Sequence, residues 1–316
     1  MGMGTTRNPE ERAHDIPPQL LAAVTRSPVK ARLFGADTYL REAAWTFAED
    51  ADVLRGTTLC VLKPDAAVGR RYGTALEALR DNGFHPADVL RVRHSRLTIR
   101  ETWRFQLNFA DRERIAAMDL YLGSLDCVLL VLRDERHRPG DVPASVRLAA
   151  LKGPATAELR RPEHLRARLG ALNGLFNFVH TADEPIDVLR DLGLLLEQPR
   201  RERVRERLLA RHDASEEARR ICDTIEAETP PHDLDPERSL HRLTRSAGPA
   251  GDVARAGRAG ATVTPADLLR AAHHPDADPA DLWDLLSVLT ATLRFNTPGI
   301  ERIFPNVLLG AWQEER

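Results

Sequence analysis

Over residues 57–199, short apolar runs alternate with stretches of helical periodicity, and this order constrains the fold more than any other feature of the chain. It reads strand, helix, strand, helix, strand, helix, irregular loop, strand, helix. Alternation of this kind favours a sheet with helices packed on it. A small ferredoxin-like α+β sandwich fits the length of the stretch, and a doubly wound sheet is the alternative. We therefore predict a ferredoxin-like antiparallel sheet with packed helices.

The expected strands differ in character. Residues 57–62 form a short β-prone run, residues 84–98 alternate as a long strand does, and residues 125–132 are nearly continuous leucine and valine. A continuous run of this kind is typical of a central strand that is buried on both faces. One expected helix ends at Gly83. One or two more cover residues 100–118, and a further helix covers residues 143–151.

The flanking segments are predicted to be helical additions to this unit. Residues 1–56 read as an N-terminal extension, because residues 39–47 place their apolar side chains on one helical face. Residues 200–229 read as a charged, solvated or interdomain helix. Proline, glycine, alanine and arginine dominate residues 229–262, which predicts a flexible segment. Helical periodicity returns from Thr264, so we divide the chain into residues 1–56, 57–198 and 199–316.

Composition excludes several classes of protein. The net charge of -2 gives no general attraction to nucleic acid or to an anionic membrane. No apolar run approaches the roughly eighteen residues that span a bilayer, and no secretory signal is visible at the start. Cys60, Cys127 and Cys222 are too far apart for a zinc or disulfide framework, and the first two read as small buried hydrophobes. We therefore expect a cytoplasmic protein that binds neither nucleic acid nor membrane.

Lysine is rare, whereas arginine is abundant. The three lysines are Lys30, Lys63 and Lys152. Since arginine has taken most surface positions for a cation, each lysine marks a position where a compact ammonium group is preferred.

His180 is the first candidate for chemistry. It ends a β-rich run over residues 175–179, and Asp183 is placed to cap the helix that follows. A side chain at such a junction projects into a cleft, and an imidazole with an ordinary pKa of about 6.5 is mostly neutral at pH 7. It can therefore act as a nucleophile or base, the alternative being an ordinary loop histidine. Neither a dinucleotide-binding nor a P-loop glycine motif occurs.

Four short motifs follow one another over residues 57–198. They are Lys63-Pro64-Asp65-Ala66, Gly73 with Gly83-Phe84, Pro162-Glu163-His164-Leu165-Arg166, and Asn177-Phe-Val-His180-Thr-Ala-Asp183. In this order they resemble the motifs of the nucleoside diphosphate kinase family. The resemblance implies a transferase that moves the γ-phosphate of ATP or another nucleoside triphosphate through a phosphohistidine to a diphosphate acceptor. It also implies a possible homo-oligomer.

The resemblance assigns roles to individual residues. His180 would carry the phosphoryl group, with Lys63 beside the phosphates and Asp191 orienting the ring. Nucleotide or phosphate contacts are implied for Lys63, Trp103, Phe105, Arg147, Thr156, Arg166 and Asn177. Magnesium would be held largely by the nucleotide phosphates, without a dedicated metal site in the protein.

Departures from the family pattern keep three functions open. Thr181-Ala182 replaces the family's Gly-Ser, Thr156 matches only with a shift, and charged residues 111–114 replace a base-stacking aromatic. Trp103 stands in place of a tyrosine, and Phe105 or Phe109 is left as a substitute for the stacking aromatic. The chain is thus read as a phosphotransferase, as a nucleotide-binding module without turnover, or as an interaction protein that acts through its C-terminal helices.

Overall fold

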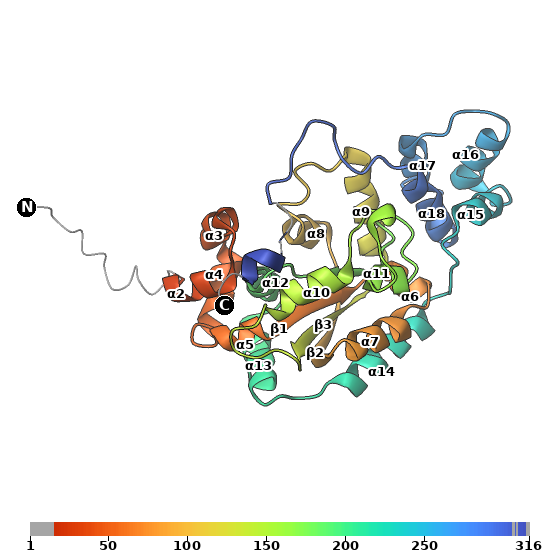
Figure 1. Cartoon of the computed structure of the whole chain (residues 1–316). Coiled ribbons are helices and arrows are strands. Elements are labelled where there is room, and N and C mark those ends of the chain that lie inside the picture. The colour runs from red at the N-terminus through yellow and green to blue at the C-terminus, as the bar shows by residue number, and fades with distance from the viewer. Residues whose placement is uncertain (1–15, 305–306, 308, 314–316) are drawn as a thin grey trace, which may run out of the picture.

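The structure, a computed structural model, describes residues 16–304, 307 and 309–313. At its centre lies a sheet in the order β2-β3-β1-β4, whose strands are Phe84–Val92, Cys127–Asp134, Thr57–Leu62 and Val179–Thr181 (Figure 1). Every neighbouring pair is antiparallel. The link from β1 to β2 therefore skips the position that β3 fills, which is the split arrangement of a ferredoxin-like sheet. This confirms the predicted fold class.

The central strands are buried on both sides. Along β1 and β3 the side chains alternate between two apolar clusters, as period-two pleating requires. Cys60 and Cys127 lie in these clusters as free buried thiols, as predicted. β2 ends at Val92, before the predicted end at residue 98, because Ser95 and Thr98 form a capping box that starts α8 (Arg96–Thr102).

Different parts of the chain cover the two faces of the sheet. On one face, α6 (Pro64–Val68), α7 (Tyr72–Asp81), α9 (Arg112–Ser124) and α10 (Ala144–Lys152) share an apolar cluster with the C-terminal helices. On the other face, α12 (Pro185–Leu195) packs with the N-terminal helices α2 (Pro18–Val24), α3 (Pro28–Gly35), α4 (Thr38–Thr46) and α5 (Ala51–Arg55). The N-terminal extension therefore completes the core on one face, whereas the C-terminal region contributes to both, since Val204 and Phe304 lie in the cluster with α12.

The C-terminal region is helical, as predicted. Its helices are α13 (Gln198–Leu209), α14 (Ser215–Glu228), α15 (Pro236–Leu243), α16 (Gly248–Arg258), α17 (Pro265–Ala272) and α18 (Leu282–Thr292). α14 lies along β2, and just before it the Ala214 amide donates a hydrogen bond to the Pro86 carbonyl at the sheet edge. The last four helices form a group beside α9 (Figure 1).

The predicted flexible segment at residues 229–262 instead contains α15 and α16. Asp235 caps α15 by accepting a hydrogen bond from the Arg238 amide, and Pro236 occupies its first position. Leu243, Ala250 and Ala254 are buried in the cluster that α18 shares. These helices are stabilised by tertiary packing, which composition does not reveal. Among the described residues, no helix has the length and apolar character needed to cross a membrane.

Candidate functional site

The backbone around His180 is fixed by the motif that follows β1. His180 lies on the short strand β4, opposite Val61. Phe178, two residues earlier, has a φ of +67°, a conformation that is uncommon for a residue with a side chain. Its amide donates to Asp65 Oδ2 at 2.8 Å, and its carbonyl accepts from the Lys63 amide at 2.9 Å. These two bonds hold the unusual turn that delivers His180.

Asp65 joins three elements at this point. Its carboxylate is fully buried and accepts a second hydrogen bond, from the Tyr121 hydroxyl of α9, at 2.6 Å. Pro64 occupies the first position of α6, where its missing N–H is not needed. Asp65 therefore stabilises the packing of these elements, whereas Lys63, two residues earlier, lines the cavity beside His180.

Five of the predicted site residues line one cavity of about 140 Å³: Lys63, Trp103, Arg166, Asn177 and His180. Arg114 and Tyr121 of α9 line it too. The Trp103 ring meets the His180 ring edge-on, with 5.0 Å between their centroids. The structure thus gathers residues that are far apart in the sequence around one half-buried imidazole.

Lys63 and Asn177 form a prearranged pair. The buried ammonium donates to Asn177 Oδ1 at 2.7 Å and to the Leu175 carbonyl at 2.8 Å. Burial lowers the pKa of Lys63 to about 8, against the opposing effect of Asp65. Because the Asn177 amide nitrogen also donates to the Gly174 carbonyl, Asn177 in this state positions the ammonium.

Two arginines bring further positive charge to the cavity. Arg166, on α11 (Leu165–Arg168), donates to the Gly153 carbonyl at 2.9 Å, and burial, followed by Arg160, lowers its pKa to about 10. Arg114 donates to Asn296 Oδ1 at 3.1 Å, and burial lowers its pKa as well. The Nε–H groups of Arg114 and Arg166 are buried and have no hydrogen-bond partner among the residues that the structure describes. Unsatisfied cationic donors of this kind suit an anionic ligand.

These surroundings keep the His180 ring neutral. Desolvation lowers its pKa to about 3, and the charges of Lys152, Lys63 and Arg166 act in the same direction. A neutral imidazole retains a free lone pair at physiological pH, which is the form that can attack phosphorus.

Asp191 lies on the other side of His180. The two side chains line a second cavity of about 20 Å³ together with Phe105, Asp183 and Asp187. Burial raises the pKa of Asp191 to about 7, and the nearby carboxylates of Asp187 and Asp183 add to the rise. In the described structure, no hydrogen bond joins Asp191 to His180, so its predicted orienting role stays a prediction.

All three lysines lie in this region. In addition to Lys63, Lys152 at the end of α10 pairs with Asp183 Oδ1 at 3.1 Å. Lys30 of α3 pairs with Asp187 Oδ2 at 2.6 Å. Because Asp183 is paired in this way, Glu184 takes the capping position of α12 that was predicted for Asp183.

The structure does not bring Arg147 and Thr156 into the cavity. The Arg147 guanidinium donates to Asp134 Oδ2 and to the Asn82 carbonyl, and it stacks over the Phe84 ring. It is thereby held at the other end of β3. Thr156 is exposed in the loop before a short 3₁₀ helix (Ala157–Leu159), and its neighbour Ala155 lines the cavity instead.

Sequence reasoning missed Arg114. The charged stretch at residues 111–114 stands where the resemblance implies an aromatic platform, although the same charge is the available signal for an arginine that lines the cavity. Its spacing places it on the inner face of α9, beside the buried Met118 and one helical turn away from it.

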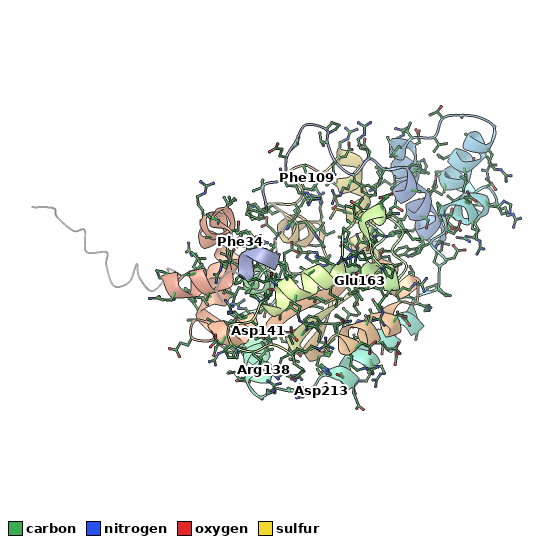
Figure 2. The ribbon with its side chains drawn as sticks, viewed as in Figure 1. Phe34, Phe109, Arg138, Asp141, Glu163 and Asp213 are labelled. Carbon is green, nitrogen blue, oxygen red and sulfur yellow. The ribbon has the colours of Figure 1, made fainter. Side chains whose placement is uncertain are left out.

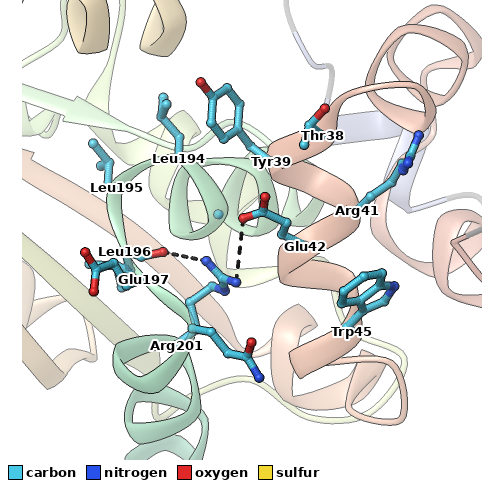
Figure 3. A pocket seen from close by; sticks show the side chains of 12 residues that line it. Thr38, Tyr39, Arg41, Glu42, Trp45, Leu194, Leu195, Leu196, Glu197 and Arg201 are labelled. Atoms are coloured by element: carbon cyan, nitrogen blue, oxygen red, sulfur yellow. Dashed lines mark hydrogen bonds and ion pairs between the residues drawn. The ribbon is translucent and has the colours of Figure 1, made fainter. Parts of the chain in front are cut away.

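A larger groove, of about 780 Å³, lies elsewhere, between α4 and the corner from α12 to α13 (Figure 3). Its one buried cation, among the residues described, is Arg201. Arg201 donates to the Leu196 carbonyl and lies 3.8 Å from Glu42 Oε2. Because His180 is not in its lining, we place the candidate site at the smaller cavity. In the part of the chain that the structure describes, no group of three or more His, Cys, Asp or Glu side chains could hold a metal ion.

Comparison with known proteins returns similarity to solved structures. No protein-family model and no curated protein matches the sequence. The chain is similar to a nucleoside diphosphate kinase of Aquifex aeolicus at 20% identity, covering 45% of this chain and 96% of that one, with a TM-score of 0.38. The corresponding values for an NDP kinase of Pyrobaculum aerophilum are 17%, 46%, 97% and 0.36. The overlap is less than half of this chain, so any function must follow from the site's own geometry.

Proposed function

We propose that this chain is a nucleotide-dependent phosphotransferase in which His180 carries the phosphoryl group. The observation that supports this most directly is a neutral imidazole in one cavity with three cations, Lys63, Arg114 and Arg166. The donor is ATP or another nucleoside triphosphate, and the acceptor is a nucleoside diphosphate or a related phosphorylated metabolite. A homo-oligomer and a cytoplasmic location remain predictions.

The transfer takes place in two balanced steps. A ring nitrogen of His180 attacks the γ-phosphorus, a P–N bond forms, and the bond from phosphorus to the bridging oxygen breaks, which releases the nucleoside diphosphate. A terminal oxygen of the acceptor then attacks the same phosphorus, the P–N bond breaks, and the ring is restored. Splitting one transfer in this way is the usual benefit of a nucleophilic side chain.

The surrounding charges have defined roles in these steps. Phosphoryl transfer depends mainly on positioning and on neutralising charge at the equatorial and leaving oxygens. The Lys63 ammonium and the free Nε–H groups of Arg114 and Arg166 supply that neutralisation. Asp191, across the ring, balances the positive charge that develops on the imidazole.

The residues of the cavity would leave magnesium to the phosphates of the substrate. The side chains of the cavity are cationic, amide, aromatic and apolar, whereas Mg²⁺ prefers oxygen ligands. The nucleotide phosphates would therefore hold the ion, and Lys63 and the arginines would contact the remaining phosphate oxygens.

The test is covalent labelling with γ-labelled ATP and Mg²⁺. We expect a label that is lost in acid and stable in base, as a phosphohistidine is, and its absence in His180→Ala. His274→Ala, which alters an exposed histidine, is the matched control and should label normally. A label that survives His180→Ala, or no label on the native chain, would overturn the proposal.

Nucleotide binding without turnover is a second candidate. It is favoured by the missing hydrogen bond between Asp191 and His180 and by the two hydrogen bonds that already hold the Lys63 ammonium within the protein. It is distinguished from the first by saturable binding of ATP without any label on His180.

A further inference from the structure

The segment after α18 forms a C-terminal arm, defined here as residues 293–304, that crosses the loop between α8 and α9 (Figure 1). Asn296 forms an isolated antiparallel bridge with Ala110. The Thr297 amide donates to the Phe109 carbonyl at 2.8 Å, and the Asn108 side chain donates to the Glu301 carbonyl at 2.8 Å. The arm is thus held to this loop mainly through backbone atoms, outside any regular strand or helix.

At its start the arm contacts the wall of the His180 cavity. Arg114, which lines that cavity, donates to the Phe295 carbonyl and to Asn296 Oδ1, both at 3.1 Å. The Phe295 ring packs against Gly174, another lining residue, so closely that a Cβ on Gly174 would lie 3.2 Å from it. The arm therefore engages the guanidinium that we assign to phosphate.

At its far end the arm contacts the second cavity. The Phe304 ring is 8% exposed and lies 5.4 Å from the Phe34 ring and 5.0 Å from the Phe105 ring. Phe34 and Phe105 line the small cavity that His180 and Asp191 share. Figure 2 labels Phe109 and Phe34, which mark the two regions that the arm connects.

The two cavities are too small for a nucleotide. Their volumes are about 140 and 20 Å³, whereas pockets that bind small organic ligands enclose about 300–1,000 Å³. Some element must therefore move before a nucleoside triphosphate reaches His180. The arm touches the walls of both cavities and lies outside any helix or strand, and irregular segments of this kind open at lower cost than core elements.

We propose that the C-terminal arm is an autoinhibitory strap that closes the nucleotide site and must leave the α8–α9 loop for nucleotide to bind. The inference rests on the proposed function. Release of Phe295 and Asn296 frees Arg114 for phosphate, and release of Phe304 uncovers the side of His180 that faces Asp191. The apparent affinity for nucleotide is then the intrinsic affinity reduced by the fraction of molecules in which the arm is open.

A disulfide that locks the arm tests the inference directly. Ala110 and Asn296 face each other across an antiparallel bridge, a geometry that a disulfide tolerates, and the three native thiols are buried. In the double variant Ala110→Cys/Asn296→Cys, we expect oxidation to weaken binding of a fluorescent ATP analogue, and to slow labelling of His180, by about tenfold or more. Dithiothreitol should reverse both effects. The reduced double variant and single Ala110→Cys are the controls.

A releasing variant should act in the opposite direction. Phe304→Ala removes both ring contacts, so we expect tighter apparent nucleotide binding and faster labelling, each by about tenfold. Ile303→Ala, which removes a neighbouring side chain that is 39% exposed, is the matched control. It should change neither the apparent affinity for nucleotide nor the rate of labelling.

The outcomes separate the two proposals. Equal binding and labelling in the oxidised and reduced double variant would overturn the strap and leave phosphotransfer intact. Binding without label in every form, with the oxidation effect present, would support the strap and sink the transfer. No nucleotide binding in any form, Phe304→Ala included, would overturn both.

Discussion

At the scale of single residues, the site is a set of ionisable groups whose pKa values are displaced by burial. Lys63 is the most sensitive of these in the alkaline range, because its pKa of about 8 lies below that of an ordinary lysine. Below pH 8 the ammonium is charged and attracts phosphate. As the pH rises through 8 it loses its proton, and the attraction is lost.

We therefore expect nucleotide affinity to fall by about tenfold between pH 7 and pH 9, as one proton is lost over that range. Equilibrium binding of a fluorescent ATP analogue would measure it. In Lys63→Arg the charge persists throughout the range, so the fall should disappear. An unchanged pH profile in that variant would assign the dependence to another group.

Asp191 makes a separate prediction about stability. Its pKa is about 7 in the folded protein and near 3.9 in an unfolded chain, so the unfolded state ionises first as the pH rises. Stability is therefore lost between these two values, and the whole penalty is present above pH 7. Asp191→Asn removes it and should raise the midpoint of thermal unfolding at pH 8, by about 2–4 °C for each kcal/mol recovered.

The same variant should label more slowly, because the ring then loses a balancing charge. Calorimetry at pH 3.5 provides the control, because Asp191 is then largely protonated in both the folded and the unfolded state. At that pH the native chain and Asp191→Asn should have the same midpoint of thermal unfolding. A variant that is less stable at pH 8 would show that Asp191 is ionised and paired in the native state.

At the scale of elements, Asp65 connects β1, α9 and the strand of His180. Asp65→Ala leaves the Tyr121 hydroxyl and the Phe178 amide buried without their acceptor. Each such group costs about 1–3 kcal/mol, so we expect a loss of about 3 kcal/mol in the free energy of unfolding, measured with urea. Asp81→Ala, which alters a half-exposed carboxylate, should cost less than about 0.5 kcal/mol.

The strands β1, β2 and β3 were predictable because their signal is local, whereas the β-rich run expected over residues 175–179 becomes a strand only at Val179, where β4 begins. The apolar runs of β1 and β3 and the alternation of apolar residues in β2 are enough to predict these three strands. α15 and α16 carry no such signal, because their small side chains are buried only through contact with neighbouring helices. The predicted phosphate contact of Arg147 was misplaced for a related reason. Its spacing put it near the motif, but its side chain is bound by the carboxylate of Asp134, which the spacing does not reveal.

At the scale of the whole molecule, the site depends on segments that sequence motifs do not reach. Lys30 comes from the N-terminal extension, and Phe295 and Phe304 come from the C-terminal arm. Their partners lie more than a hundred residues away along the chain, and no periodicity links such positions. Most of the candidate site within residues 57–198 was therefore predictable, whereas the contacts that the terminal segments make with it required the structure.

The apolar cluster on the α9 face begins with Cys60 and ends with Leu293. It runs across the predicted boundary at residue 198, because α14 to α18 add buried side chains to the cluster that α6, α7, α9 and α10 form on this face. On the ribosome, where chains emerge from the N-terminus, this cluster would lack its last members, on α18, until more than a hundred residues after β4 have been made. A chain truncated before α17 would leave exposed the side of α9 that α17 and α18 contact, so we expect such a truncation to be less soluble than the full chain.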